Sequence, residues 1–227
     1  MTDQTALDNP AYHALLGPHA RLAQRRGNAL RYPADVAPFV GLPAEPGPDD
    51  WAALATLTGR SGIAATAGVP ADPPDVWRVL TIIDGVQLTG DGVVGASDPE
   101  AITLDSADVP EMLDLVARTQ PGPFLRRTIE FGGYLGIRRG GTLVAMAGER
   151  LRPPGWTEIS AVCTDPEFRG LGLAARLTLA VTAAIRARGD APFLHVMASN
   201  GTAIRLHESL GFQFRRGASF VVARAPA

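Results

Sequence analysis

The segment best suited to chemistry is Arg169-Gly170-Leu171-Gly172-Leu173-Ala174, with two glycines two residues apart. A β-rich run, Glu158 to Thr164, precedes it and ends at Asp165-Pro166, and an amphipathic stretch to Arg188 follows. A strand, a short loop and a glycine-containing helix start leave free backbone N–H groups at the positive end of a helix dipole. Small residues let a ligand approach that backbone closely. The segment therefore predicts a cradle for a diphosphate.

Several other chemistries are excluded by what the chain lacks. Every basic residue is arginine, so neither the lysine of a P-loop nor a Schiff-base lysine is present. The four histidines show no metal-ligand spacing, and Cys163 is the only cysteine, so we expect no zinc site and no intramolecular disulfide.

Composition sets the broad class. The chain has 227 residues, 46% hydrophobic and 19% charged, with a formal net charge of −2. This balance is typical of a globular domain and gives no electrostatic reason to expect a nucleic-acid or anionic-membrane partner. No apolar run approaches the roughly 20 residues needed to span a bilayer, and the polar first residues do not resemble a signal peptide. We therefore expect a cytoplasmic protein.

The elements that must position the glycine loop follow from periodicity. From residue 101 onward the pattern predicts β-α-β-β-β-α-β-α-β-β, a mixed α/β layer architecture. Two short strands, 212–214 and 219–223, end it. Residues 1–95 have a different texture and are predicted to form a smaller α/β subdomain, with the boundary in the Gly-, Asp- and Ser-rich segment 90–100 and the main domain over 96–227.

A second block, Asn200 to Phe212, supports the first. Arg169, Gly172 and Ala174 match the cofactor motif Arg/Gln-x-x-Gly-x-Gly/Ala, and the second block matches Asn-x-x-Ala-x-x-x-Tyr-x-x-x-Gly-Phe except at His207. With this order of elements, residues 101–224 resemble the GNAT superfamily of acyl-CoA-dependent N-acetyltransferases. The resemblance implies a GNAT-type fold with acetyl-CoA as cosubstrate.

The same resemblance implies which residues hold the coenzyme. Backbone N–H groups of the loop would bind its pyrophosphate, and the preceding strand would pair with the pantetheine arm. The residues implied are Val162, Cys163, Thr164, Arg169, Gly170, Leu171, Gly172, Leu173, Ala174, Ala175, Asn200 and Ala203. Taken alone, the loop could equally be an ordinary helix start, and Asn200 an ordinary N-cap.

Two residues are candidates for proton transfer. Glu158 lies where some members of the family carry a general-base glutamate. In a partly dry cleft beside Trp156 and Ile159 its pKa would be raised, which suits a base. The alternative is a solvated or arginine-paired carboxylate, with ordered water as the base. His207 replaces a tyrosine thought to protonate the leaving thiolate, and as imidazolium it could donate to the sulfur. It could also simply fill space.

The resemblance implies direct transfer of acetyl to a primary amine in a ternary complex. Val162 is the expected backbone donor to the thioester carbonyl, and residues 119–124 are a candidate wall of the acceptor pocket. The acceptor, a small molecule or a peptide, is not specified, and a homodimer stays open. Two alternatives remain: a non-catalytic acyl-CoA sensor, and a nucleotide-binding doubly wound fold. The latter lacks the acidic residue expected about 20 positions on.

Overall fold

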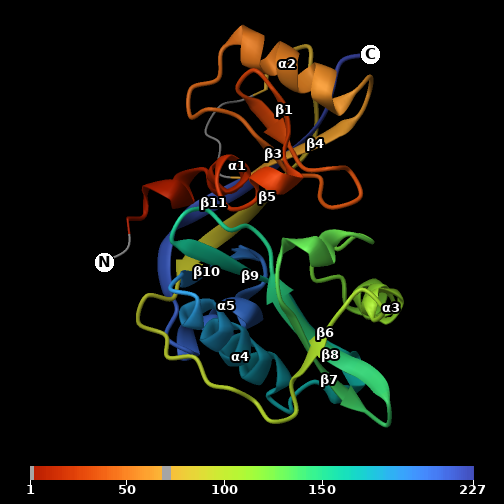
Figure 1. Ribbon diagram of the computed structural model, residues 1–227, viewed down its shortest axis with the longest axis vertical. Coiled ribbons are helices and arrows are strands. Elements are labelled where there is room, and N and C mark those ends of the chain that lie inside the picture. Colours follow the sequence, from red (N-terminus) through yellow and green to blue (C-terminus); the bar gives the residue numbers. More distant parts are fainter. Residues whose placement is uncertain (1–2, 68–72) are drawn as a thin grey trace.

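A computed structural model describes residues 3–67 and 73–227. Its centre is an eight-stranded mixed sheet with the strand order β4-β11-β5-β10-β9-β8-β7-β6 (Figure 1). β9 and β10 are parallel, and the other neighbouring strands are antiparallel. The strands of this sheet are β4 (Ile63–Ala67), β5 (Arg78–Thr89), β6 (Ile102–Leu104), β7 (Tyr134–Arg139), β8 (Thr142–Glu149), β9 (Trp156–Thr164), β10 (Ala191–Met197) and β11 (Gln213–Arg224). The mixed α/β fold class is confirmed.

Helices cover both faces of the sheet. α4 (Leu173–Ala187) and α5 (Gly201–Ser209) pack on one face, where α4 buries Leu177 and Val181 against Ile159 of β9. α3 (Val109–Thr119) lies on the opposite face with Met112 and Leu115 buried. Apolar residues at helical spacing therefore form these interfaces.

The first part of the chain forms a second, smaller layer around α1 (Pro10–Leu16) and α2 (Pro48–Thr58). Its own sheet has the strand order β1-β2-β3. Its strands are β1 (Gln24–Arg26), β2 (Ala29–Arg31) and β3 (Val40–Gly41). Short 3₁₀ turns lie at Thr5–Asp8, Ala20–Leu22, Thr128–Phe131 and Pro166–Phe168. In Figure 1 this layer occupies the upper part of the molecule, with the C-terminus beside α2.

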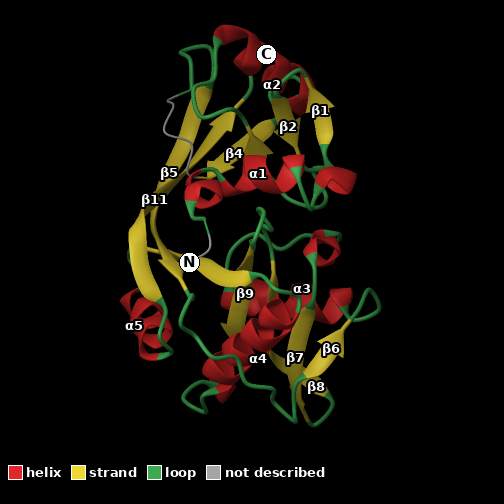
Figure 2. Ribbon diagram, turned by 60° about the vertical axis from the view of Figure 1, so that its left-hand side comes forward, coloured by secondary structure: helices red, strands yellow, loops and turns green. Residues whose placement is uncertain are grey.

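The first 95 residues nevertheless supply two strands of the large sheet. β5 lies between β10 and β11, and β4 forms the edge beyond β11. Figure 2 shows β5 and β11 running along one side of the molecule from the main sheet to the smaller layer. The boundary expected near residue 95 thus falls in the sequence between β5 and β6, while hydrogen bonds of the sheet join the two parts.

The two C-terminal strands expected at 212–214 and 219–223 are instead one strand, and that prediction was wrong. β11 runs from Gln213 to Arg224 as one strand, with register shifts against β5 at Phe214/Arg216 and Val222/Ala223. Gly217 pairs with Val86 of β5, so the residues between the two expected strands also belong to the ladder. The reason is nonlocal: β5 is long enough to pair with both halves of β11.

No helix in the described part of the chain is long and apolar enough to cross a membrane.

Candidate functional site

The glycine loop has an open backbone. Gly170 and Gly172 have φ angles of 80° and 73°, a region that side chains disfavour, and Gly172 is the N-cap of α4. A Cβ built on either glycine would meet no atom within 4 Å. Packed side chains therefore do not seal the loop, and a ligand has room to approach it.

The amides of this loop are available to a ligand. Arg176 N–H donates to the Gly172 carbonyl at 3.1 Å, which closes the first turn of α4. Within the described chain, the amides of residues 170–175 have no backbone acceptor. Helix α4 has 15 residues, so its dipole adds positive potential at the same place.

The arginines beside the loop differ in their partners. Arg176 is held by Asp98, with Nε–Oδ2 at 2.6 Å, and by Glu100. Arg169 is exposed and makes only a 3.4 Å contact from Nε to the Thr164 carbonyl, and none of the ion pairs found among the described residues involves it. Arg169 is therefore the side chain free to meet an anion at this loop.

The strand before the loop separates from its parallel neighbour. β9 pairs with β10 only as far as Ile159, opposite Leu194. Beyond that point, residues 160–164 pair with β8 alone. Between Ser160 and Cys163 a β-bulge sets two residues opposite one, and Ala161 there has a φ of 53°. A bulge next to diverging strands turns backbone groups out of the ladder, as active sites often require.

The bulge also decides which way the neighbouring side chains point. Val162 is half-buried with the α4 cluster, whereas Cys163 is buried with the α3 cluster. Burial raises the pKa of the Cys163 thiol to about 11, so it stays protonated at neutral pH. Contact with a coenzyme through this strand would therefore involve the backbone of 162–164 and not the thiol.

The second motif begins a short helix. Asn200 Oδ1 accepts a hydrogen bond from Ala203 N–H at 3.0 Å, so Asn200 is the N-cap of α5. Its side chain is exposed at the end of β10. This capping role was the simpler of the two interpretations of Asn200, and Ala203 is its partner.

The expectation of a raised pKa at Glu158 was wrong, and the arginine-paired carboxylate, its alternative, is the arrangement found. The Glu158 side chain is fully buried between Arg150 and His195. Arg150 Nη2 lies 2.6 Å from Oε1 of Glu158, and Arg150 Nε lies 2.9 Å from Oε2. His195 Nδ1 lies 2.6 Å from Oε1. Burial alone would raise the pKa, but Arg150 and then His195 outweigh it and hold the pKa of Glu158 well below its usual range.

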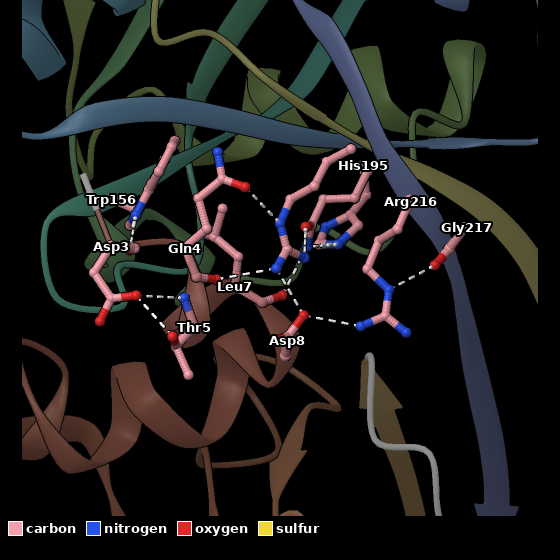
Figure 3. Close-up of polar contacts among 11 residues, drawn as sticks. Asp3, Gln4, Thr5, Leu7, Asp8, Trp156, His195, Arg216 and Gly217 are labelled. Carbon is pink, nitrogen blue, oxygen red and sulfur yellow. Dashed lines mark hydrogen bonds and ion pairs between the residues drawn. The ribbon is translucent and has the colours of Figure 1, made fainter. Parts of the chain in front are cut away.

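From His195, a network of hydrogen bonds continues to the N-terminal segment. Gln87 Nε2 lies 3.0 Å from His195 Nε2 and donates to the Leu7 carbonyl at 3.0 Å. Arg215 donates to Gln87 Oε1 at 2.8 Å and to Asp8 Oδ1 at 2.7 Å. Figure 3 shows His195, Leu7 and Asp8 within this network, where Leu7 and Asp8 are reached through Gln87 and Arg215 and not by direct bonds to His195. Because Gln87 turns its amide nitrogen to His195, the pattern fits the imidazole tautomer with hydrogen on Nδ1, which donates to Glu158.

For His207 the sequence left two roles open, an imidazolium donor and a ring that fills space, and the structure favours the second. The ring is 5% exposed, lies against Phe212 with the ring centroids 5.7 Å apart, and its Nδ1 has no hydrogen-bond partner in the described chain. Burial lowers the pKa of His207 to about 4. The ring is neutral at pH 7, as the space-filling interpretation requires.

Sequence reasoning missed Arg150 and Gln87, which decide the ionisation of Glu158 and the setting of His195. Arg150 follows β8, and Gln87 belongs to a strand far away in the sequence. No motif or spacing connects them to Glu158. The signal that existed was weak: Glu158, His195 and Gln87 are each a polar residue inside an apolar strand.

Comparison with known proteins agrees with this architecture. Residues 134–221 match the FR47-like protein family model. A structure from Novosphingobium aromaticivorans, assigned to the GNAT family of acetyltransferases, is 40% identical, with a TM-score of 0.88 over 97% of this chain and 99% of that one.

Two relatives match part of the chain. A mycothiol acetyltransferase of Thermobispora bispora is 38% identical over 119 residues, which is 47% of this chain and 38% of the relative. The N-alpha-acetyltransferase RimI of Mycobacterium tuberculosis is 40% identical over 83 residues, 35% of this chain and 51% of the relative. The chain thus spans about half or less of these relatives' lengths. With the glycine loop, the diverging strands and near-complete coverage of the Novosphingobium structure, these matches show that the chain belongs to the GNAT family of acetyltransferases.

Proposed function

We propose that this protein is an N-acetyltransferase that transfers the acetyl group of acetyl-CoA directly to a primary amine in a ternary complex. The observation that carries the proposal is the open row of amides at residues 170–175, at the N-terminus of a 15-residue helix. Such a row binds a diphosphate through hydrogen bonds and the helix dipole together. The residues present fit the coenzyme.

Each part of the site then has a task. The amides of 170–175 would hold the pyrophosphate, and Arg169 would add a charged donor from the exposed side. The backbone of 162–164, freed from β10, would pair with the pantetheine arm, and Val162 N–H would polarise the carbonyl. When bound, acetyl-CoA supplies an activated acetyl thioester for attack by the amine.

The acceptor side is proposed near residues 119–124, which follow α3. Arg118 holds Asp165 at 2.9 Å, so this segment is tied to the turn that leads into the glycine loop. The relatives' names include mycothiol for one and N-alpha-acetylation for the other. Both a small molecule and a peptide N-terminus therefore stay within the proposal.

Deprotonation of the amine falls to water and not to Glu158 or His207. Glu158 is ionised but inaccessible, with both oxygens engaged. His207 is neutral and buried. Catalysis then rests on positioning and on backbone donors. The rate should rise with pH until the acceptor amine is itself deprotonated.

The burial of both Glu158 and His207 favours one alternative function, a non-catalytic acyl-CoA-binding sensor. A protein that only binds the coenzyme needs the cradle but no group to move a proton. Turnover decides between the two functions.

The test joins binding to turnover. Acetyl-CoA should raise the melting temperature of the protein where NAD and ATP do not, and an amine panel should release free coenzyme A. Gly172→Glu should abolish coenzyme binding in calorimetry, because it sets a carboxylate where the pyrophosphate belongs. Gly172→Ala is the matched control: it carries the same strain at a φ of 73° without the charge, and should keep most of the affinity.

Unchanged affinity in Gly172→Glu would remove the loop from the coenzyme site. Tight binding of acetyl-CoA without release of coenzyme A across the panel would leave the sensor as the function.

A further inference from the structure

One stretch of β5 concentrates the exposed apolar residues of the molecule. Of the twelve large hydrophobic residues found exposed in the described chain, half lie on or next to this stretch. They are Val76, Val79, Leu80, Ile82, Ile83 and Met197, exposed by 37–69%. Scattered exposed hydrophobics are normal, whereas a contiguous group indicates a contact surface.

This stretch is also an open sheet edge. β10 pairs with β5 only up to Gly85, and its extension ends where Ala198 N–H donates to the Asp84 carbonyl at 2.9 Å. Residues 78–83 pair with β11 on one side, and on the other side no strand of the described chain pairs with them. Figure 2 shows this part of β5 running along the flank of the molecule. We call residues 78–84 the β5 edge.

The β5 edge is complementary to itself. Its sequence is Arg78-Val79-Leu80-Thr81-Ile82-Ile83-Asp84. In an antiparallel pairing of two copies about Thr81, Arg78 of one copy faces Asp84 of the other. The apolar residues between them then face each other, Val79 with Ile83 and Leu80 with Ile82. Opposite charges directly across from each other stabilise such a pairing, and like charges would not.

A hollow beside the edge can accept a side chain. It has a volume of about 450 Å³ and is lined by Ile82, Ile83, Asp84, Met197, Ala198 and Ser199. Leu80 of a second copy, facing Ile82, would reach into it. A bulge between Thr81 and Val79 shifts the register of β5 against β11 and bends β5 at this point. In the contact between two copies we therefore expect side chains to contribute more than backbone hydrogen bonds.

We infer that the β5 edge is the contact of a two-fold homodimer, with a second copy of this chain as its occupant. The pairing is independent of the coenzyme loop, which lies on other elements. An edge of seven residues buries less than the roughly 1,200–2,000 Å² of a standard stable interface, so the dimer dissociates on dilution.

Sedimentation across a wide range of protein concentration measures this. The wild type should approach twice the mass of one chain as concentration rises. Ile82→Asp should stay monomeric, because it buries unpaired carboxylates at the contact. Val94→Asp is the matched control: Val94 is 83% exposed and outside the edge, and its substitution should leave dimerisation unchanged.

A charge exchange tests the pairing itself. Arg78→Asp and Asp84→Arg should each weaken the dimer, and the double variant should recover it, since both cross-pairs are then restored with reversed sign. Circular dichroism of each variant checks that the fold is intact, because Asp84 also accepts a hydrogen bond from Ser219 at 3.1 Å. A wild type that is monomeric at every concentration overturns the inference, and so does a dimer that tolerates Ile82→Asp or a double variant that shows no recovery.

Discussion

At the scale of residues, the centre of the molecule holds two buried ionisable side chains in opposite states. Glu158 is charged because Arg150 and His195 supply more stabilisation than burial removes. His207 has no such partner, so burial alone decides and the ring is neutral. Both were candidates for proton transfer, and in both the buried surroundings set the charge. Residue type and position in a motif do not predict a pKa, because the pKa depends on burial and on neighbours that only the fold brings into contact.

The ion pair of Glu158 gives a direct prediction. Glu158→Gln should lower the free energy of unfolding by about 3–5 kcal/mol, because it leaves the Arg150 charge buried without compensation. Urea denaturation measures the change. Adding Arg150→Met to Glu158→Gln should recover part of the loss, since the uncompensated charge is then gone. Normal stability together with a displaced pH–rate profile would return Glu158 to the chemistry.

His207 predicts how stability depends on pH. Burial lowers the pKa of His207 to about 4 in the folded protein, whereas an exposed histidine of the unfolded chain has its ordinary pKa of 6.5. The unfolded chain therefore binds more protons between these values, and stability falls as pH is lowered from 6.5 towards 4. His207→Phe should flatten that decline, which chemical denaturation at a series of pH values would detect. An equally steep decline in the variant would show that the His207 ring is not kept neutral in the fold.

At the scale of elements, the important feature is a strand that serves two parts of the chain. β11 pairs only with β4 and β5 among the described strands, and both of these precede residue 95. β10 also loses its antiparallel neighbour if β5 is removed. Leu88 of β5 is fully buried in the cluster that α4 covers. The glycine loop and its helix thus depend on a sheet in which one interior strand, β5, comes from the first part of the chain.

Separate production of residues 96–227 tests that dependence. The fragment should show no cooperative thermal transition, because β11 would have no partner and β10 would expose an edge. Co-expression with residues 1–95 should restore a folded complex, and the full-length chain is the reference. A fragment that melts cooperatively and binds acetyl-CoA by itself would show that the two parts are separable domains.

At the scale of the whole molecule, the sequence predicted what is encoded locally. The β-rich run from Glu158 to Thr164 predicted a strand and lies within β9, Trp156–Thr164, since such a run next to turn residues specifies a strand by itself. The glycine loop and α4 were predictable for the same reason. The place of β5 between β10 and β11 was not, because nothing within β5 encodes its distant neighbours. The Arg150 pairing of Glu158 escaped prediction for another reason: the two residues are eight positions apart, and only the antiparallel register of β8 and β9 brings them together.

The interposed strand also sets the order of events when the chain is made. Thr89 of β5 pairs with Phe193 of β10 and Gln213 of β11, which are both synthesised roughly a hundred or more residues later. The β5–β10 and β5–β11 pairings therefore form late. Until β10 leaves the ribosome β5 has neither of its neighbours in the sheet, and residues 78–83 stay unpaired until β11 follows. An apolar strand in that state is available to other nascent chains. We therefore expect this protein to fold slowly and to need a chaperone while it is synthesised. Both consequences come from β5, a strand early in the sequence that lies inside the sheet.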